Sequence, residues 1–129
     1  MAYNFAKAGN TDSGVNVIQN FWKDKGIEPY AINIFDGSGL SPSNRVTTKA
    51  LVTVMEYARN QNWFPSFYQA LPTISGIKMK SGSINGVISY TGYIKGKDNN
   101  QYTFSFVINN YDGSGNAVRQ KMWKLLEIL

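Results

Sequence analysis

The sequence predicts an α+β fold in which a three-stranded antiparallel sheet is flanked by helices. Two segments with apolar residues at helical spacing come first, and three segments that alternate apolar and polar residues follow them. A last amphipathic segment leads to the C-terminus. Helices segregated from a run of antiparallel strands are typical of the α+β class, and a chain of 129 residues fits one domain over 1–129.

The first helix is expected to begin at an N-cap, Thr11 or Asp12, and to stop at Gly26. Apolar residues recur at helical spacing along it, so we expect a buried face made of Val15, Ile18, Phe21 and Trp22. Residues 31–35 alternate and predict a short strand or an extended connector. Residues 36–44, "DGSGLSPSN", are mostly turn formers and predict a loop.

A second helix is predicted from a cap at Thr47 or Thr48 to about Asn60. Its inward side is expected to hold Leu51, Val54, Met55 and Ala58. The next segment, "WFPSFYQAL" at 63–71, reads as a short aromatic helix that contains Pro65. These helices precede the sheet in the chain.

Three strands are predicted at about 74–81, 86–95 and 101–110. The polar segment "KGKDNN" joins the last two as a hairpin turn, and we expect the first strand to pair alongside the second as a meander. A further turn at 112–116 leads into the final helix. Its apolar positions are expected to pack on the sheet through Val118, Met122, Leu125, Leu126 and Leu129.

The sequence contains neither cysteine nor histidine. Disulfides, thiolate nucleophiles, Cys/His zinc sites and a Ser-His-Asp triad are therefore excluded within this chain. The carboxylates show no paired spacing of the kind that a glycosidase or a metal site uses, so we expect no metal and no cofactor. Any chemistry must use lysine, serine, tyrosine, asparagine or isolated carboxylates.

Charge and hydropathy restrict the partners. The net charge is +5, but the basic residues are scattered and no aromatic RNA-binding motif accompanies them, so no nucleic-acid partner is expected. Apolar runs such as 50–55 are far too short for a transmembrane segment. Residues 1–4 lack the charged and apolar regions of a signal peptide.

The most informative stretch is "IKMKSGSINGVISYTGYI", which places Lys80, Ser81, Gly82 and Ser83 on the first predicted strand. Glycine inside a strand commonly marks a bulge or the close approach of a ligand. A strand edge can hold an extended peptide by backbone pairing, and Gly82 would let that peptide or a lactam approach. Lys80 would attract a carboxylate, to which the hydroxyls of Ser81 and Ser83 could donate. Alone, these residues also fit a surface lysine on an interrupted strand.

The order "DGSGLSPSN", "KMKSGSINGVISYTGYI" and "YTFSFVINNY" resembles the C-terminal part of the class C penicillin-binding proteins, with Lys80-Ser81-Gly82 at the family's Lys-Thr/Ser-Gly motif. These are D-alanyl-D-alanine carboxypeptidases with endopeptidase activity. The resemblance implies a partial β-lactamase/transpeptidase-like fold and a periplasmic parent that hydrolyses peptidoglycan peptides ending in D-Ala-D-Ala and binds β-lactams. It also implies that Lys80 is catalytic, that Ser81, Gly82 and Ser83 bind substrate, and that the Ser83 N–H serves an oxyanion hole.

The family's nucleophile, the serine of Ser-x-x-Lys, is expected to lie outside this chain. Ser75 and Lys78 fit the pattern, but they would face opposite sides of a strand. Ser83-Ile84-Asn85 and Ser114-Gly115-Asn116 fit Ser-x-Asn and are interpreted as coincidental. The chain is therefore expected to be a C-terminal fragment, inactive alone, whose exposed sheet edge and apolar surface favour self-association.

One other interpretation of the function stays open beside this one, and the role of one carboxylate stays open as well. The chain is alternatively a non-catalytic module that binds an acyl-D-alanine peptide or a protein partner through the Lys80 strand. Covalent labelling by a fluorescent penicillin distinguishes that module from an enzyme. Asp36, with Ser38 and Ser41, either orders a loop beside the active site or simply caps turns, and the structural role is favoured.

Overall fold

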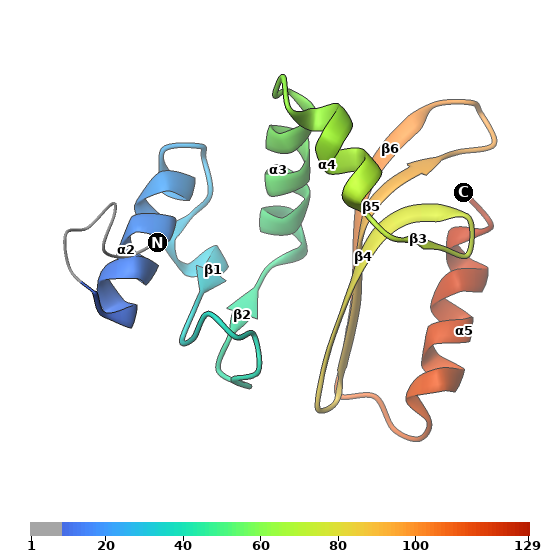
Figure 1. Cartoon of the computed structure of the whole chain (residues 1–129). Coiled ribbons are helices and arrows are strands. Elements are labelled where there is room, and N and C mark those ends of the chain that lie inside the picture. Colours follow the sequence, from blue (N-terminus) through green and yellow to red (C-terminus); the bar gives the residue numbers. More distant parts are fainter. Residues whose placement is uncertain (1–8) are drawn as a thin grey trace. The chain divides into compact units, whose positions relative to one another are not determined.

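The computed structural model describes residues 9–129, and the segment considered above for a signal peptide lies outside them. The chain divides into two compact units, one ending at Ala50 and the other running from Leu51 to Leu129. The units are described separately. The predicted α+β class is confirmed, with helices and antiparallel sheets along the chain (Figure 1).

In the first unit, helix α2 (Thr11–Lys23) begins one or two residues earlier than the predicted caps, Thr11 and Asp12, would place it. Its N-cap is Asn10, whose side-chain oxygen accepts a hydrogen bond from the Ser13 backbone N–H at 2.8 Å. An asparagine in extended conformation satisfies that orphan donor of the first turn, which fixes the helix start there. Gly26, with a φ of 85°, lies in the turn that follows the helix, as the stop signal predicted.

The predicted buried face of α2 is wrong in part, because α2 contains no fully buried residue and Phe21 is 44% exposed. The ring of Phe21 instead packs edge-on against Trp22, at a centroid distance of 5.0 Å, and the Lys25 ammonium lies 5.5 Å from its centroid. These local contacts hold an aromatic ring at the surface that periodicity alone would place inside.

Two short strands complete the first unit. β1 (Ile32–Asn33) follows the 3₁₀ turn η1 (Pro29–Ala31) and pairs antiparallel with β2 (Arg45–Val46). The Gln19 side chain donates to the Ile32 carbonyl at 3.2 Å and ties α2 to β1. The predicted loop lies between β1 and β2.

The second unit carries a four-stranded antiparallel sheet of order β3-β4-β5-β6, which are Thr73–Ile74, Ile77–Ile84, Val87–Lys95 and Gln101–Asn109. The predicted hairpin and the pairing of the Lys80 strand beside it are confirmed. The strand expected at about 74–81 is corrected, because Ser75 and Gly76 turn the chain with φ values of 51° and 79° and divide it into β3 and β4.

Helices lie on both faces of this sheet. Helix α5 (Gly115–Leu126) covers one face, where Met79, Ile88, Tyr90, Ile94, Met122 and Leu126 form a buried cluster. Helices α3 (Thr48–Arg59) and α4 (Phe64–Ala70) pack at the other face, where Met55, Leu71 and Tyr93 are buried with aromatic residues of α4 (Figure 1). The sheet is thus covered on both sides at one end.

The expectation that Leu125 and Leu129 pack on the sheet is wrong, because they are 54% and 52% exposed. Met122 and Leu126 are buried and Trp123 packs against their cluster. At about 100° per residue, Leu125 lies about 100° from the centre of that stripe. Leu129 follows the end of the helix.

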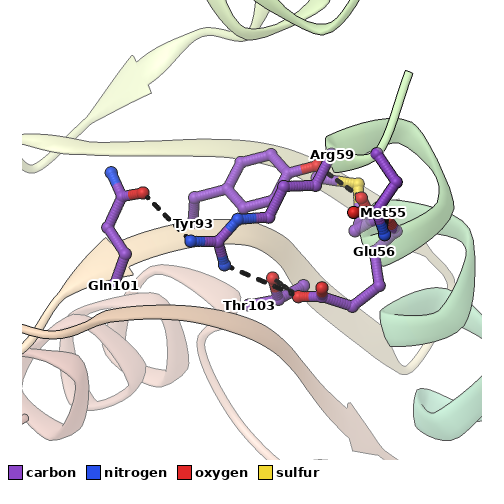
Figure 2. A network of polar contacts seen from close by, with 7 residues as sticks. Met55, Glu56, Arg59, Tyr93, Gln101 and Thr103 are labelled. Atoms are coloured by element: carbon purple, nitrogen blue, oxygen red, sulfur yellow. Dashed lines mark hydrogen bonds and ion pairs between the residues drawn. The ribbon is translucent and has the colours of Figure 1, made fainter.

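A polar network joins α3 to the sheet (Figure 2). The Tyr93 hydroxyl donates to the Met55 carbonyl at 2.7 Å, and the Thr103 hydroxyl donates to the Glu56 carboxylate. Arg59 donates to the Gln101 side chain at 3.3 Å and lies 3.8 Å from Glu56. Strands β5 and β6 are therefore fixed to one side of α3 at the end of the sheet away from the Asn85-Gly86 turn.

Candidate active-site strand

All four residues predicted to form the site lie on β4, and all four are exposed. Lys80 is paired with Thr91, Ser81 with Tyr90, Gly82 with Ser89 and Ser83 with Ile88. The backbone of this segment is therefore held on one side by β5.

The other side of this segment has no partner strand among residues 9–129. β3 pairs only with Ile77 and Lys78, and one further bond runs from the Met79 N–H to the Pro72 carbonyl at 3.1 Å. Beyond Met79, β4 is an edge strand. Its backbone groups are available to an extended ligand there.

The alternation of the antiparallel ladder determines which backbone groups point to this edge. Because the Met79 N–H points away from β5, Ser81 and Ser83, two and four residues further on, direct their N–H and C=O groups the same way. The Lys80 ammonium reaches this edge too, since it donates to the Ser81 carbonyl at 2.9 Å. One edge thus combines a positive charge with outward N–H and C=O groups.

Side chains along β4 alternate between the two faces. Met79 is fully buried against α5, so Ser81 and Ser83 share the α5 face, and Arg119 of α5 donates to the Ser83 hydroxyl at 3.4 Å. Lys80 and Gly82 lie on the opposite face. A ligand group can therefore meet Lys80 and either serine hydroxyl together only at the open edge, between the faces.

The place of a side chain at Gly82 is already taken. A Cβ there would lie 2.6 Å from the Ser89 hydroxyl oxygen, and Ser89 donates to the Gly82 carbonyl at 3.4 Å. A side chain at position 82 would therefore displace the Ser89 hydroxyl, so glycine here leaves room for that hydroxyl, beside any role in admitting a ligand.

Sequence reasoning missed a hydroxyl pair on the Lys80 face. Thr91, directly across from Lys80, is 8% exposed, and its hydroxyl lies 3.1 Å from that of Ser105 on β6. The alternation of small polar residues in "ISYTGY" and "YTFSF" was the available signal. The polar character of this face extends from Lys80 across three strands.

The chance match to Ser-x-x-Lys does not form a catalytic pair. Ser75 lies in the β3–β4 turn. The Lys78 ammonium donates instead to the Leu71 carbonyl at 2.9 Å and to the Gln69 carbonyl at 3.3 Å. Lys78 is therefore engaged at the end of α4.

Comparison with known proteins shows the family of the chain. The chain matches the profile of the D-Ala-D-Ala carboxypeptidase 3 (S13) family over residues 1–78 and 75–128. The chain belongs to this family of carboxypeptidases. A D-alanyl-D-alanine carboxypeptidase of Actinomadura sp. (strain R39) is 26% identical in an alignment 129 positions long, which covers 84% of this chain and 24% of that enzyme.

Two solved structures share the fold of this S13-family chain. Penicillin binding protein 4 of Haemophilus influenzae matches with a TM-score of 0.73 and 21% identity, over 95% of this chain and 34% of that one. Its complex with a novel β-lactam matches with a TM-score of 0.73 and 22% identity, over 97% and 34% of the respective chains. The S13-family chain thus spans about a quarter to a third of the relatives it matches.

In the first unit, the Asp36 carboxylate accepts hydrogen bonds from Ser38, Asn44 and the Gly39 and Ser41 amides. Partial desolvation acts to raise the pKa of Asp36, but these hydrogen bonds outweigh it and hold the pKa below its ordinary value. The carboxylate caps successive turns of its own loop, which is the favoured structural interpretation.

No group of three or more acidic side chains suited to a metal ion occurs within residues 9–129. None of the helices described there is long and apolar enough to cross a membrane.

Proposed function

We propose that this S13-family chain supplies the Lys-Ser-Gly strand of a serine-type D-alanyl-D-alanine carboxypeptidase. The enzyme hydrolyses peptidoglycan stem peptides through an acyl-enzyme and reacts with β-lactams, and its nucleophile comes from a Ser-x-x-Lys segment outside these 129 residues. The cell wall substrate implies a periplasmic location. The isolated chain would then be inactive.

The observation that carries this proposal is the open edge of β4. Within the described part of the chain, this strand pairs only with β5 beyond Met79, and its outward groups lie beside the Lys80 ammonium. An extended peptide ending in a carboxylate matches both features, because its backbone can pair with the edge while its charge is drawn to the lysine.

Lys80, Ser81 and Ser83 each have a role in the proposed mechanism. Lys80 binds and orients the substrate carboxylate at the edge, and the hydroxyls of Ser81 and Ser83 approach the same edge from the α5 face. The outward N–H of Ser83 donates to the oxyanion that forms when the nucleophile attacks. One such donor contributes on the order of 3 kcal/mol to transition-state stabilisation.

A non-catalytic module that binds an acyl-D-alanine peptide remains the second candidate. The engagement of Lys78 with the end of α4 leaves the Ser-x-x-Lys match at Ser75 without a free base, which fits a chain that binds the peptide but does not hydrolyse it. Both candidates use the same edge. The edges of β4 and β6, neither covered by a further strand among residues 9–129, also support self-association of the isolated chain.

A fluorescent penicillin tests the proposal in two arms. The 129-residue chain should remain unlabelled; a covalent label on it would show that the nucleophile lies within. In the longest natural protein that contains these residues, labelling should be covalent, and Lys80→Ala should slow acylation about ten- to a hundredfold. That range corresponds to about 1.5–3 kcal/mol, the typical loss of a charge-assisted contact.

Lys95→Ala is the matched control, since Lys95 is an exposed lysine at the end of β5 in the same sheet. Both variants should unfold at the wild-type temperature, because neither side chain is part of the core. Equal acylation rates in the two variants would remove Lys80 from the site. An unlabelled full-length protein that still binds an acyl-D-alanine peptide would favour the module.

A further inference from the structure

Lys78 and Lys80 share one face of β4 but have different partners. The Lys80 ammonium is exposed and, among residues 9–129, bonds only to the carbonyl of the next residue. The Lys78 ammonium is partly buried and donates to two carbonyls at the end of α4, those of Gln69 and Leu71. It also lies 5.9 Å from the centroid of the Tyr68 ring.

The end of α4 is suited to this cation. The last carbonyls of a helix lack intrahelical donors and carry partial negative charge, so an ammonium placed on them satisfies both needs. The Tyr68 ring adds its negative face on one side. Lys78 thus links the start of β4 to the end of α4, across the segment that contains the β3–β4 turn.

The position of this contact along β4 matters for the proposed site. On its outer side β4 is attached at Ile77 and Lys78 by β3 and at Met79 by the Pro72 carbonyl. Lys80 is the next residue, where the open edge begins. Across the sheet Lys78 pairs with Tyr93, whose ring contacts Tyr68 at 5.8 Å and whose hydroxyl is fixed to α3.

We propose that Lys78 is a positioning residue, which clamps β4 to the C-terminal end of α4 and so fixes the place where the Lys80 edge begins. The inference rests on the proposed role of Lys80 for its catalytic consequence. The clamp itself is a property of the fold and can be measured without any substrate.

Hydrogen exchange on the 129-residue chain tests the clamp directly. Lys78→Met keeps the apolar stem but removes the donors, Lys78→Arg keeps charge and donors, and Lys95→Met is the control. In Lys78→Met the amides of Met79 and Lys80 should exchange about tenfold faster, as expected for the loss of a partly exposed charge-assisted contact. Amides of Phe104 and Phe106 on β6 should be unchanged.

Lys78→Arg should restore protection to within about twofold of wild type, since the guanidinium can donate to the same carbonyls. Unchanged exchange at Met79 and Lys80 in Lys78→Met, or a uniform rise that includes β6, would overturn the clamp. If Lys78→Met does not fold, Lys78→Gln, with a shorter polar end, allows the same comparison.

Penicillin acylation of the longest natural protein that contains the chain tests the consequence for the site. Lys78→Met should slow acylation several-fold with an unchanged pH profile, and Lys78→Arg should recover most of the rate. If Lys78→Met shows faster hydrogen exchange at Met79 and Lys80 but an unchanged acylation rate, the clamp has no effect on catalysis and the positioning role is wrong. If penicillin does not acylate the wild-type longer protein, the proposed function is wrong, whereas the hydrogen-exchange result for the clamp is unaffected.

Discussion

Replacing Gly92 with alanine should disrupt the contact between β4 and β5 next to the candidate site. Gly92 pairs with Met79, and a Cβ at position 92 would lie 2.2 Å from the Lys78 carbonyl oxygen and 2.6 Å from both Cα and Cβ of Met79. None of these atoms is the end of a flexible side chain. The strands must therefore move apart to admit one methyl group.

The magnitude follows from opposing terms. Overpacking costs about 1–3 kcal/mol, with the upper end expected where backbone must move. A weakened ladder hydrogen bond adds about 1 kcal/mol. Alanine offsets about 0.5–1 kcal/mol because it loses less backbone entropy than glycine on folding. The net loss in the free energy of unfolding is about 2–3 kcal/mol, or roughly 8–12 °C in Tm for a domain of this size.

Urea and thermal unfolding followed by circular dichroism measure this loss. Gly37→Ala is the matched control, because a Cβ at Gly37 meets nothing within 4 Å, and its effect should stay within about 0.5 kcal/mol. Gly82→Ala should fall between them, since the Ser89 hydroxyl that it meets can rotate away. A Tm of Gly92→Ala within about 2 °C of wild type would refute the packing argument.

Two further predictions concern polar groups. Tyr93→Phe leaves the Met55 carbonyl without its donor and should cost about 1–2 kcal/mol in urea unfolding, whereas retained stability would show that the bond contributes nothing. Burial, with the Glu56 charge, raises the pKa of Tyr93 to about 12. The contribution of the neutral Tyr93 to the free energy of unfolding should therefore be fully present below pH 10 and be lost as the pH rises toward 12. In Tyr93→Phe this pH dependence should be weaker. The pKa of Asp36 is lowered, so its contribution is present above its ordinary value of 3.8 and is lost as pH falls below it. Hydrogen exchange of the Gly39 amide measures this dependence on pH. In Asp36→Asn the protection of that amide should change less at acid pH than in the wild type, and an identical change in both proteins would contradict the hydrogen-bond argument.

The sheet was predictable from sequence because its three long strands alternate over eight or nine residues each. That alternation fixed the meander and put Lys80 on a strand. The division into β3 and β4 was not visible, since it depends on Ser75 adopting a φ of 51°, which serine rarely does. Asn10 as the cap of α2 lay just outside the window that the apolar periodicity suggested.

The residues of the candidate site were predictable because their types match a known motif, but the arrangement of their side chains was not predicted correctly. The opposite faces of Lys80 and the two serines follow from the period of a strand, and the expectation of one shared carboxylate contact did not apply that period. The clamp by Lys78 was beyond reach for another reason. Its partners are backbone carbonyls at the end of α4. Every residue has a backbone carbonyl, so the residue types in the sequence do not indicate which carbonyls accept from Lys78.

The openness of the β4 edge depends on a length that no motif encodes. β3 has two residues and pairs no further than Lys78, so no strand from the described residues 9–129 lies beside the outward groups of Ser81 and Ser83. A β3 longer by five residues at its N-terminal end would, in the register of Thr73 with Lys78, pair with the groups of both Ser81 and Ser83 and leave Lys80 as an ordinary surface lysine. Pro72, directly before β3, has no N–H to extend the ladder, and α4 ends just before it. The short β3, Pro72 and the clamp by Lys78 together leave the edge of β4 open from Lys80 onward.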